Sequence, residues 1–219
     1  INARLDAGAL TRAMITATEA KTAALQELMA PSRYSEGLAT GSGTDSLIAV
    51  CNEESETVLY GAGKHVLLGE MIGQSVKEAI TCALELQSGM NAQRQSYFLQ
   101  QGLRYGLGAE ALLAHYRAEH PEAWQSEEVR REALERLAAD GHLSAQIALL
   151  LHLVDQWRWG LISWASLVAL AQLGLVYIAR RYQLGAYIGT LGQMEEQRHE
   201  LLLTELRQLL VRILYKQLN

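Results

Sequence analysis

The stretch that decides the expected fold is "LATGSGTDSLIAVC" (residues 38–51), followed closely by "YGAGKHVLLGE" (residues 60–70). In the first stretch, a loop of glycine, threonine and aspartate leads into an apolar run. In the second, an apolar run leads into a loop with glycines, a lysine and a histidine. Short apolar runs bounded by such loops are typical of buried β-strands. We therefore expect strands at 46–51 and 57–60, joined by the acidic turn "NEESE".

Two strands this close in sequence predict an antiparallel hairpin. In a hairpin, the start of the first strand lies beside the end of the second. The loop at 40–45 and the loop at 61–65 would then lie together at one end of the sheet. Two adjacent polar loops indicate an assembled active site, in which Asp45 and His65 meet. A pair of ordinary glycine turns is the alternative.

Two helices are expected to pack on this hairpin, over 7–30 and over 66–87. In the first, apolar residues recur three and four positions apart, and Pro31 ends the run. The second has the same periodicity, and Ser88 and Gly89 follow it. The expected class is α+β: an antiparallel hairpin or small sheet packed by two helices, followed by a mostly α-helical C-terminal bundle. We place the two domains at 1–90 and 91–219.

The composition excludes some classes of protein. The chain has 219 residues, of which 49% are hydrophobic, enough for one large or two small domains. Its net charge of −5 and its lack of a basic stripe give no basis for nucleic-acid binding. Cys51 and Cys82 lie in apolar stretches without metal-ligand spacing, so we expect buried thiols, a reducing cytoplasmic setting and no metal site. Because the first residue is Ile1, we expect a piece of a longer protein.

Three residues are the catalytic candidates. Lys21 falls within the apolar stripe of the first helix, where it either reaches out to solvent or serves as an anion clamp in a polar pocket. Asp45 directly precedes the first expected strand, where it can orient a histidine, ligate a metal or act as a base. The alternative is that its carboxylate only caps the backbone amides of the local turn. His65 precedes a helix, whose exposed amides favour an oxyanion. A histidine without a role is its alternative.

The remaining polar residues of these loops are candidates for substrate binding: Glu19, Thr40, Gly41, Gly43, Thr44, Lys64 and Glu70. Thr40 and Thr44 offer hydroxyl groups, while Ser42 lacks the G-x-S-x-G setting of a hydrolase nucleophile. Glu70 falls on the polar face of the second helix. Neither glycine loop matches a phosphate-binding motif.

Three stretches together resemble the adenosylcobinamide amidohydrolase family of corrinoid salvage. They are "TATEAKTAALQEL" (16–28), "ATGSGTDSLIAVC" (39–51) and "GAGKHVLLGEMI" (61–72). The resemblance covers about residues 1–85, and the N-terminal part of the family domain is expected to be missing. It implies hydrolysis of the amide that joins aminopropanol to the corrin ring system, with the corrinoid as substrate and no cofactor. The products would be adenosylcobyric acid and aminopropanol.

The mechanism expected for this reaction uses His65, oriented by Asp45, to activate water or a threonine hydroxyl. Lys21, Lys64 or loop amides would stabilise the oxyanion. A metal-activated water held by His65 and acidic groups remains open, although no ligand spacing supports it. A non-catalytic corrinoid-binding or assembly protein, with a helical domain that docks a partner, is the alternative function.

The second half is expected to be helical, with one helix over 126–141 and a last one from about residue 191 that suits a bundle or a helix-mediated oligomer. The uncharged run at 161–179 has tryptophans before it and Arg180 and Arg181 after it, as a membrane span does. A buried bundle helix fits the same run and is favoured over membrane association.

Overall fold

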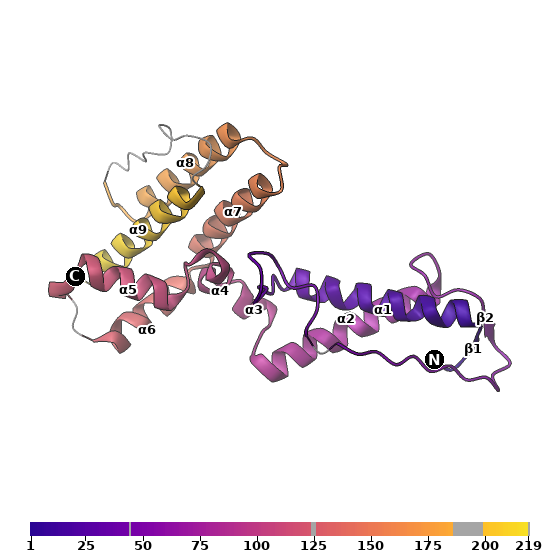
Figure 1. Cartoon of the computed structure of the whole chain (residues 1–219). Helices are drawn as coiled ribbons and strands as arrows, with labels where there is room; N and C mark the ends of the chain where they lie inside the picture. Colours follow the sequence, from indigo (N-terminus) through magenta and orange to yellow (C-terminus); the bar gives the residue numbers. More distant parts are fainter. Residues whose placement is uncertain (44, 124–125, 186–198, 219) are drawn as a thin grey trace. The chain divides into compact units, whose positions relative to one another are not determined.

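The computed structural model describes residues 1–43, 45–123, 126–185 and 199–218. The chain divides into two compact units, Ile1–Gln95 and Ser96–Asn219. Figure 1 labels the elements of both units in chain order. The α+β class expected for the chain is confirmed, since a small sheet is accompanied by many helices.

The first unit contains two strand–helix pairs. Strand β1 (Arg4–Leu5) leads into α1 (Ala7–Glu27), and strand β2 (Val58–Leu59) leads into α2 (Leu67–Ser88). The strands pair in parallel, with Arg4 opposite Val58 and Leu5 opposite Leu59. The two helices therefore leave the same end of the sheet, and they lie side by side in Figure 1.

The predicted antiparallel hairpin is wrong. Residues 46–51 form no strand, and the expected strand at 57–60 is reduced to β2. The first residues of the chain occupy the place beside both segments: the Ile1 amino group donates to the Val50 carbonyl, and the Arg4 amide donates to the Thr57 carbonyl. A parallel partner requires a crossover connection, which α1 begins, so nearness in sequence does not identify the partner of β2.

Helix α1 forms because its sequence is rich in alanine, the residue with the highest helix propensity. Asp6 caps its N-terminus by accepting a hydrogen bond from the Ala9 amide. The buried face of α1 consists mainly of small side chains: Ala9, Ala13, Thr16, Ala17, Ala20, Ala24 and Leu25. Small side chains on this face let α2 approach closely.

The loop before α2 also approaches that helix closely. A Cβ atom at Gly69 would lie 1.9 Å from the Gly63 carbonyl oxygen, so only glycine fits this position. Thr16 donates a hydrogen bond of 2.8 Å to the Ala62 carbonyl, which ties the same loop to α1. Further along, Lys77 of α2 pairs with Glu27 at the end of α1. The contact that comes later on α1 also comes later along the second segment, so α1 and α2 run in the same direction.

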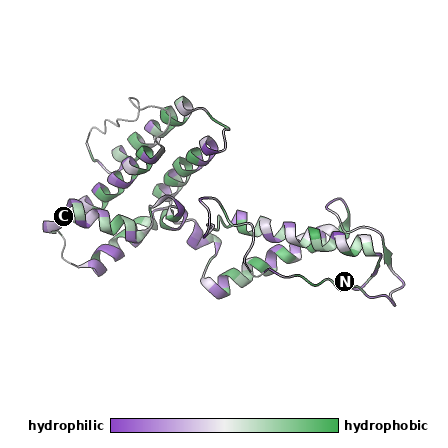
Figure 2. Ribbon diagram, viewed as in Figure 1, coloured by the Kyte–Doolittle hydropathy of each residue, from purple (hydrophilic) through white to green (hydrophobic). Residues whose placement is uncertain are grey.

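The second unit is helical throughout its described residues. After α3 (Ala92–Gln95), which closes the first unit, its elements are α4 (Phe98–Gln101), η1 (Leu103–Tyr105), α5 (Ala109–Glu119), η2 (Pro121–Ala123), α6 (Glu127–Ala138), α7 (Gly141–Arg158), α8 (Trp164–Arg181) and α9 (His199–Leu218). Their apolar faces meet in one core that includes Phe98, Leu112, Ile147, Leu175 and Leu206. Figure 2 shows hydrophobic and hydrophilic residues alternating along these helices, as amphipathic packing requires.

A buried ion pair lies within the core of the second unit. Arg104 of η1 donates to both carboxylate oxygens of Asp155 on α7, and both side chains are almost completely buried. The Tyr105 hydroxyl donates to the Leu151 carbonyl one turn earlier on α7. Burial raises the pKa of Tyr105 well above its usual range, and the neighbouring Asp155 carboxylate raises it further. These polar contacts fix η1 against α7.

The expected helices of the second half agree in part with the structure. The helix predicted over 126–141 is α6, and the last predicted helix corresponds to α9, although its residues 191–198 lie outside the described part of the chain. The run at 161–179 falls mostly in α8, one face of which is buried in the core. No single helix among the described residues is long and apolar enough to cross a membrane; α6 and α7 meet the requirement only together, across an 80° bend.

Candidate functional site

Two polar clusters lie on different sides of α1. One cluster is centred on Glu19 and the other on Lys21. These two residues are two positions apart in the chain, which is a rotation of about 200° around a helix. The cluster at Lys21 contacts the loop at 40–45. The cluster at Glu19 contacts the loop at 61–65. The two loops that sequence analysis singled out are therefore both held by α1, on opposite flanks.

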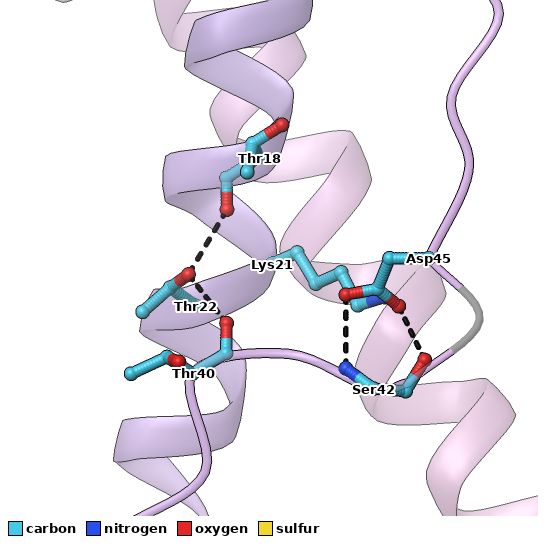
Figure 3. Close-up of polar contacts among 6 residues, drawn as sticks. All are labelled: Thr18, Lys21, Thr22, Thr40, Ser42 and Asp45. Carbon is cyan, nitrogen blue, oxygen red and sulfur yellow. Dashed lines mark hydrogen bonds and ion pairs between the residues drawn. The ribbon is translucent and has the colours of Figure 1, made fainter.

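The Lys21 cluster joins an amine, a carboxylate and a hydroxyl, as Figure 3 shows. The Lys21 ammonium pairs with the Asp45 carboxylate, and the Ser42 hydroxyl donates to that same carboxylate. The Ser42 amide donates to the other Asp45 oxygen at 2.9 Å. Lys21 is therefore not a lysine that merely reaches out to solvent: its side chain is 25% exposed and ends on a partner.

The same loop is fixed to α1 at further points. The Thr22 hydroxyl donates to the Thr40 carbonyl at 2.8 Å, and the Gln26 amide group donates to the Ala39 carbonyl at 3.0 Å. A Cβ atom at Gly41 would lie 2.5 Å from an Asp45 carboxylate oxygen, so a larger residue there would displace that carboxylate from its present position. These contacts make the Lys21 cluster an anchor for the loop.

The other residues of this loop that were predicted to bind substrate take little part in the Lys21 cluster. A Cβ atom at Gly43 would meet nothing within 4 Å, so the structure gives no steric reason for a glycine there. The predicted residue Thr44 lies outside the described residues. Thr40 takes part through its backbone carbonyl.

The Glu19 cluster contains one carboxylate between two cations. Glu19 Oε2 lies 3.2 Å from Lys64 Nζ and 3.6 Å from an Arg12 guanidinium nitrogen. That oxygen is buried, yet it accepts no hydrogen bond of good geometry. The two cations are the neighbours of this oxygen, while the Glu19 side chain as a whole is 40% exposed.

A groove of about 700 Å³ runs along this flank between α1 and α2. Its α1 side consists of Thr16, Glu19, Ala20 and Ala23, and Lys64 stands at its edge. Its α2 side consists of eight residues between positions 69 and 82, among them the predicted residue Glu70. A cleft of this size with a few converging polar groups is the usual form of a small-molecule site.

The structure separates two of the predicted catalytic residues. Asp45 contacts Lys21 and Ser42 on one flank of α1, and no contact joins it to His65 among the described residues. His65 is exposed and follows Lys64 in the chain, but it does not line the groove beside Glu19. The structure does bring together Glu19 and Lys64, which sequence analysis proposed as substrate-binding residues.

Several residues at these clusters escaped sequence analysis. Arg12 lies seven positions before Glu19, a spacing that places both on one helix face and that was available from the sequence. Ser42 was set aside for lack of a nucleophile motif, yet its hydroxyl contacts Asp45. Cys82 was expected to be buried but is exposed, and it lines the groove together with Lys77. In the described part of the chain, no three His, Cys, Asp or Glu side chains are grouped to hold a metal ion.

Among known proteins, a family model of an amidohydrolase matches residues 1–92, the part of the chain that contains these motifs. The family is that of adenosylcobinamide amidohydrolase, which confirms the resemblance noted from the sequence. An uncharacterized protein of Methanocaldococcus jannaschii is 46% identical over 84 residues. That segment is 38% of this chain and 32% of the relative, so the chain spans about a third of the length of that relative. No solved structure matches the chain.

Proposed function

We propose that the first unit hydrolyses the aminopropanol amide of adenosylcobinamide, giving adenosylcobyric acid and aminopropanol. One observation carries this proposal: Glu19 and Lys64 come from two separate stretches that resemble the amidohydrolase family, and they meet at the edge of the α1–α2 groove. A carboxylate and an ammonium group at one end of a cleft are the groups that amide hydrolysis requires.

In the proposed reaction, the Glu19 carboxylate accepts a proton from a water molecule as that water attacks the amide carbon. Negative charge develops on the amide oxygen, and the Lys64 ammonium stabilises it. The tetrahedral intermediate collapses when the C–N bond breaks, and the amine nitrogen takes up the proton that Glu19 removed from the water, which restores the Glu19 carboxylate. The products are a carboxylate on the corrinoid and free aminopropanol.

This proposal redistributes the roles that were predicted from the sequence. Glu19 takes the role of base in place of His65, because Asp45 contacts Lys21 and is not in contact with His65. His65 is exposed and does not line the groove, so the proposed reaction gives it no step. Asp45 and Lys21 hold the loop at 40–45 against α1 and do not touch the reacting atoms.

The test is to incubate the purified chain with adenosylcobinamide and to separate the products by chromatography. We expect adenosylcobyric acid and aminopropanol in equal amounts from the wild type. The Glu19→Gln variant removes the base and should lower turnover by about 10²- to 10⁴-fold. Arg12→Gln is the matched control, because it removes a charged neighbour of Glu19 but leaves the base in place.

A non-catalytic corrinoid-binding protein would give a different result. Such a protein would retain adenosylcobinamide in equilibrium dialysis and release no aminopropanol. If the wild type binds adenosylcobinamide but forms no product, the chain is a corrinoid carrier and the hydrolase proposal fails. Turnover of Glu19→Gln at the wild-type rate would instead remove Glu19 from the mechanism and leave the activity standing.

A further inference from the structure

The floor of the α1–α2 groove is made of small residues. Ala20 and Ala23 form it on α1, while Gly69 and Gly73 form it on α2, one turn apart. Gly69 is fixed by the close approach of Gly63. Gly73 has no such constraint, because a Cβ atom there would meet nothing within 4 Å. The space above Gly73 therefore belongs to the groove and not to the packing of the helices.

The α2 side of the groove carries a row of polar groups. Gln74, Lys77 and Thr81 follow one another at spacings of three and four residues, so they form a single line along the helix. Gln74 donates to Glu70 at 3.1 Å, and Lys77 pairs with Glu27. Hydrogen-bonding groups thus border a floor without large side chains.

Two charged pairs have a member that lines the groove. Glu19 pairs with Lys64, and Glu27 pairs with Lys77. The two glutamates are eight residues apart on α1, which is a distance of about 12 Å along a helix. A ligand whose scissile amide lies at Glu19 would therefore extend along the groove toward Lys77.

We propose that this groove is the subsite for the edge of the corrin ring system that bears the scissile amide, and that Lys77, one helical turn before Thr81 in the lining, is a specificity residue. The inference rests on the proposed function. A corrinoid is a broad macrocycle with amide arms around its edge, and amide arms match the polar row on α2. A groove of about 700 Å³ suits a drug-sized part of a ligand, so it holds one edge of the macrocycle and leaves the adenosyl group outside.

The decisive variant is Gly73→Leu, which places a leucine side chain in the groove. It should fold, because nothing lies within 4 Å of the new Cβ atom and leucine has a higher helix propensity than glycine. The matched control is Ser75→Leu, which adds a leucine at an exposed α2 position that does not line the groove. Binding is measured by equilibrium dialysis with adenosylcobinamide, whose colour reports its concentration, and any chain that turns the substrate over is compared in a Glu19→Gln background. Circular dichroism verifies the fold of each variant.

We expect Gly73→Leu to weaken binding by at least tenfold and Ser75→Leu to bind as the wild type does. If Gly73→Leu binds and turns over the substrate normally, the subsite is wrong and the hydrolase proposal stands. If the wild type binds in a Gly73-dependent way but releases no aminopropanol, the subsite stands and the hydrolase proposal fails. If the wild type neither binds nor hydrolyses adenosylcobinamide, both proposals fail.

Lys77 is tested by Lys77→Met, which keeps the length of the side chain and removes its charge. Because Lys77 is distant from the scissile amide, KM should rise about tenfold while kcat stays within twofold. A loss that falls on kcat alone would contradict a role in recognition. Equal KM values for the variant and the wild type would likewise overturn the assignment of Lys77.

Discussion

The chain contains two ion pairs of similar chemistry in opposite surroundings. In the first unit, the side chains of Glu19 and Lys64 are 40% and 61% exposed, and they stand beside a groove. In the second unit, the side chains of Arg104 and Asp155 are 6% and 4% exposed, within a large apolar core. A ligand can therefore reach the Glu19–Lys64 pair, whereas the Arg104–Asp155 pair is enclosed by protein.

This difference separates a functional role from a structural one. An exposed pair contributes little to stability because water screens it, so its groups remain available to a substrate. A buried pair is costly to break because removing one partner leaves the other charged and desolvated. Substitutions in the two pairs should therefore change different measurements: catalysis for the first pair and folding for the second.

The largest effect should come from Asp155→Ala, which leaves Arg104 buried without its carboxylate. We expect a loss of about 3–5 kcal/mol in the free energy of unfolding of the second unit. All four tryptophans lie in residues 96–219, so tryptophan fluorescence during chemical denaturation reports on that unit. The double variant Arg104→Met, Asp155→Leu should recover most of the loss. An equal loss in the double variant would show that packing, and not charge, accounts for the effect.

Next in size is Lys64→Met, which removes the proposed oxyanion donor. Turnover of adenosylcobinamide should fall about a hundredfold or more, since one such donor is worth that much. Stability should change little, because the Lys64 side chain is 61% exposed. Lys64→Arg keeps the charge and should restore part of the rate. Wild-type turnover in Lys64→Met would remove this pair from catalysis.

A smaller effect is expected at Asp140, which caps α7 in the second unit. Burial alone would raise the pKa of Asp140, but hydrogen bonds from Tyr182 at 2.7 Å, from the Leu143 amide and from Arg181 outweigh it and lower the pKa to about 2. A carboxylate with a lowered pKa in the folded state stabilises the protein above its ordinary pKa near 3.8, and this stabilisation is lost as the pH falls through 2.

The test of this linkage is Asp140→Asn, because asparagine still caps a helix but has no charge. We expect a loss of about 1 kcal/mol at neutral pH, after allowing for screening by solvent, and a shallower decline of stability between pH 4 and 2. Denaturant titrations at several pH values measure both. If the stability of Asp140→Asn falls between pH 4 and 2 as steeply as that of the wild type, the charge of Asp140 does not contribute to stability.

The smallest effect should come from Asp45→Asn, which breaks the pair with Lys21. Since the Asp45 side chain is 37% exposed, the loss of stability should not exceed about 1 kcal/mol. Turnover should stay within tenfold of the wild type if this cluster only anchors the loop. A fall in turnover of a hundredfold or more with unchanged stability would instead give Asp45 the catalytic role that was predicted from the sequence.

The helices of this protein were predictable because their signals are local. The expected helix at 7–30 corresponds to α1, and the expected helix at 66–87 corresponds to α2, each within three residues. The strands were less predictable. The run at 46–51 is apolar enough for a strand, but whether it forms one depends on its neighbours, and Val50 contacts the amino group of Ile1.

The candidate site shows the same limit. Glu19 and Lys64 were recognisable as candidates because they lie in motifs that resemble a family. The contact between Glu19 and Lys64 was not recognisable from the sequence, since it depends on how the loop at 61–65 packs on α1. Asp45 was assigned to His65 because the hairpin would have joined their loops. In the parallel arrangement, Lys21 reaches that aspartate instead.

The sequence by itself determined the helical segments, the family-like motifs and the residue types able to perform hydrolysis, because periodicity, capping and motif spacing act over a few residues. The tertiary structure decided which of those residues meet. The parallel register of β1 with β2, the partner of Lys21 and the groove beside Glu19 all depend on contacts between residues far apart in the chain. Such contacts depend on three-dimensional packing, which no local pattern specifies.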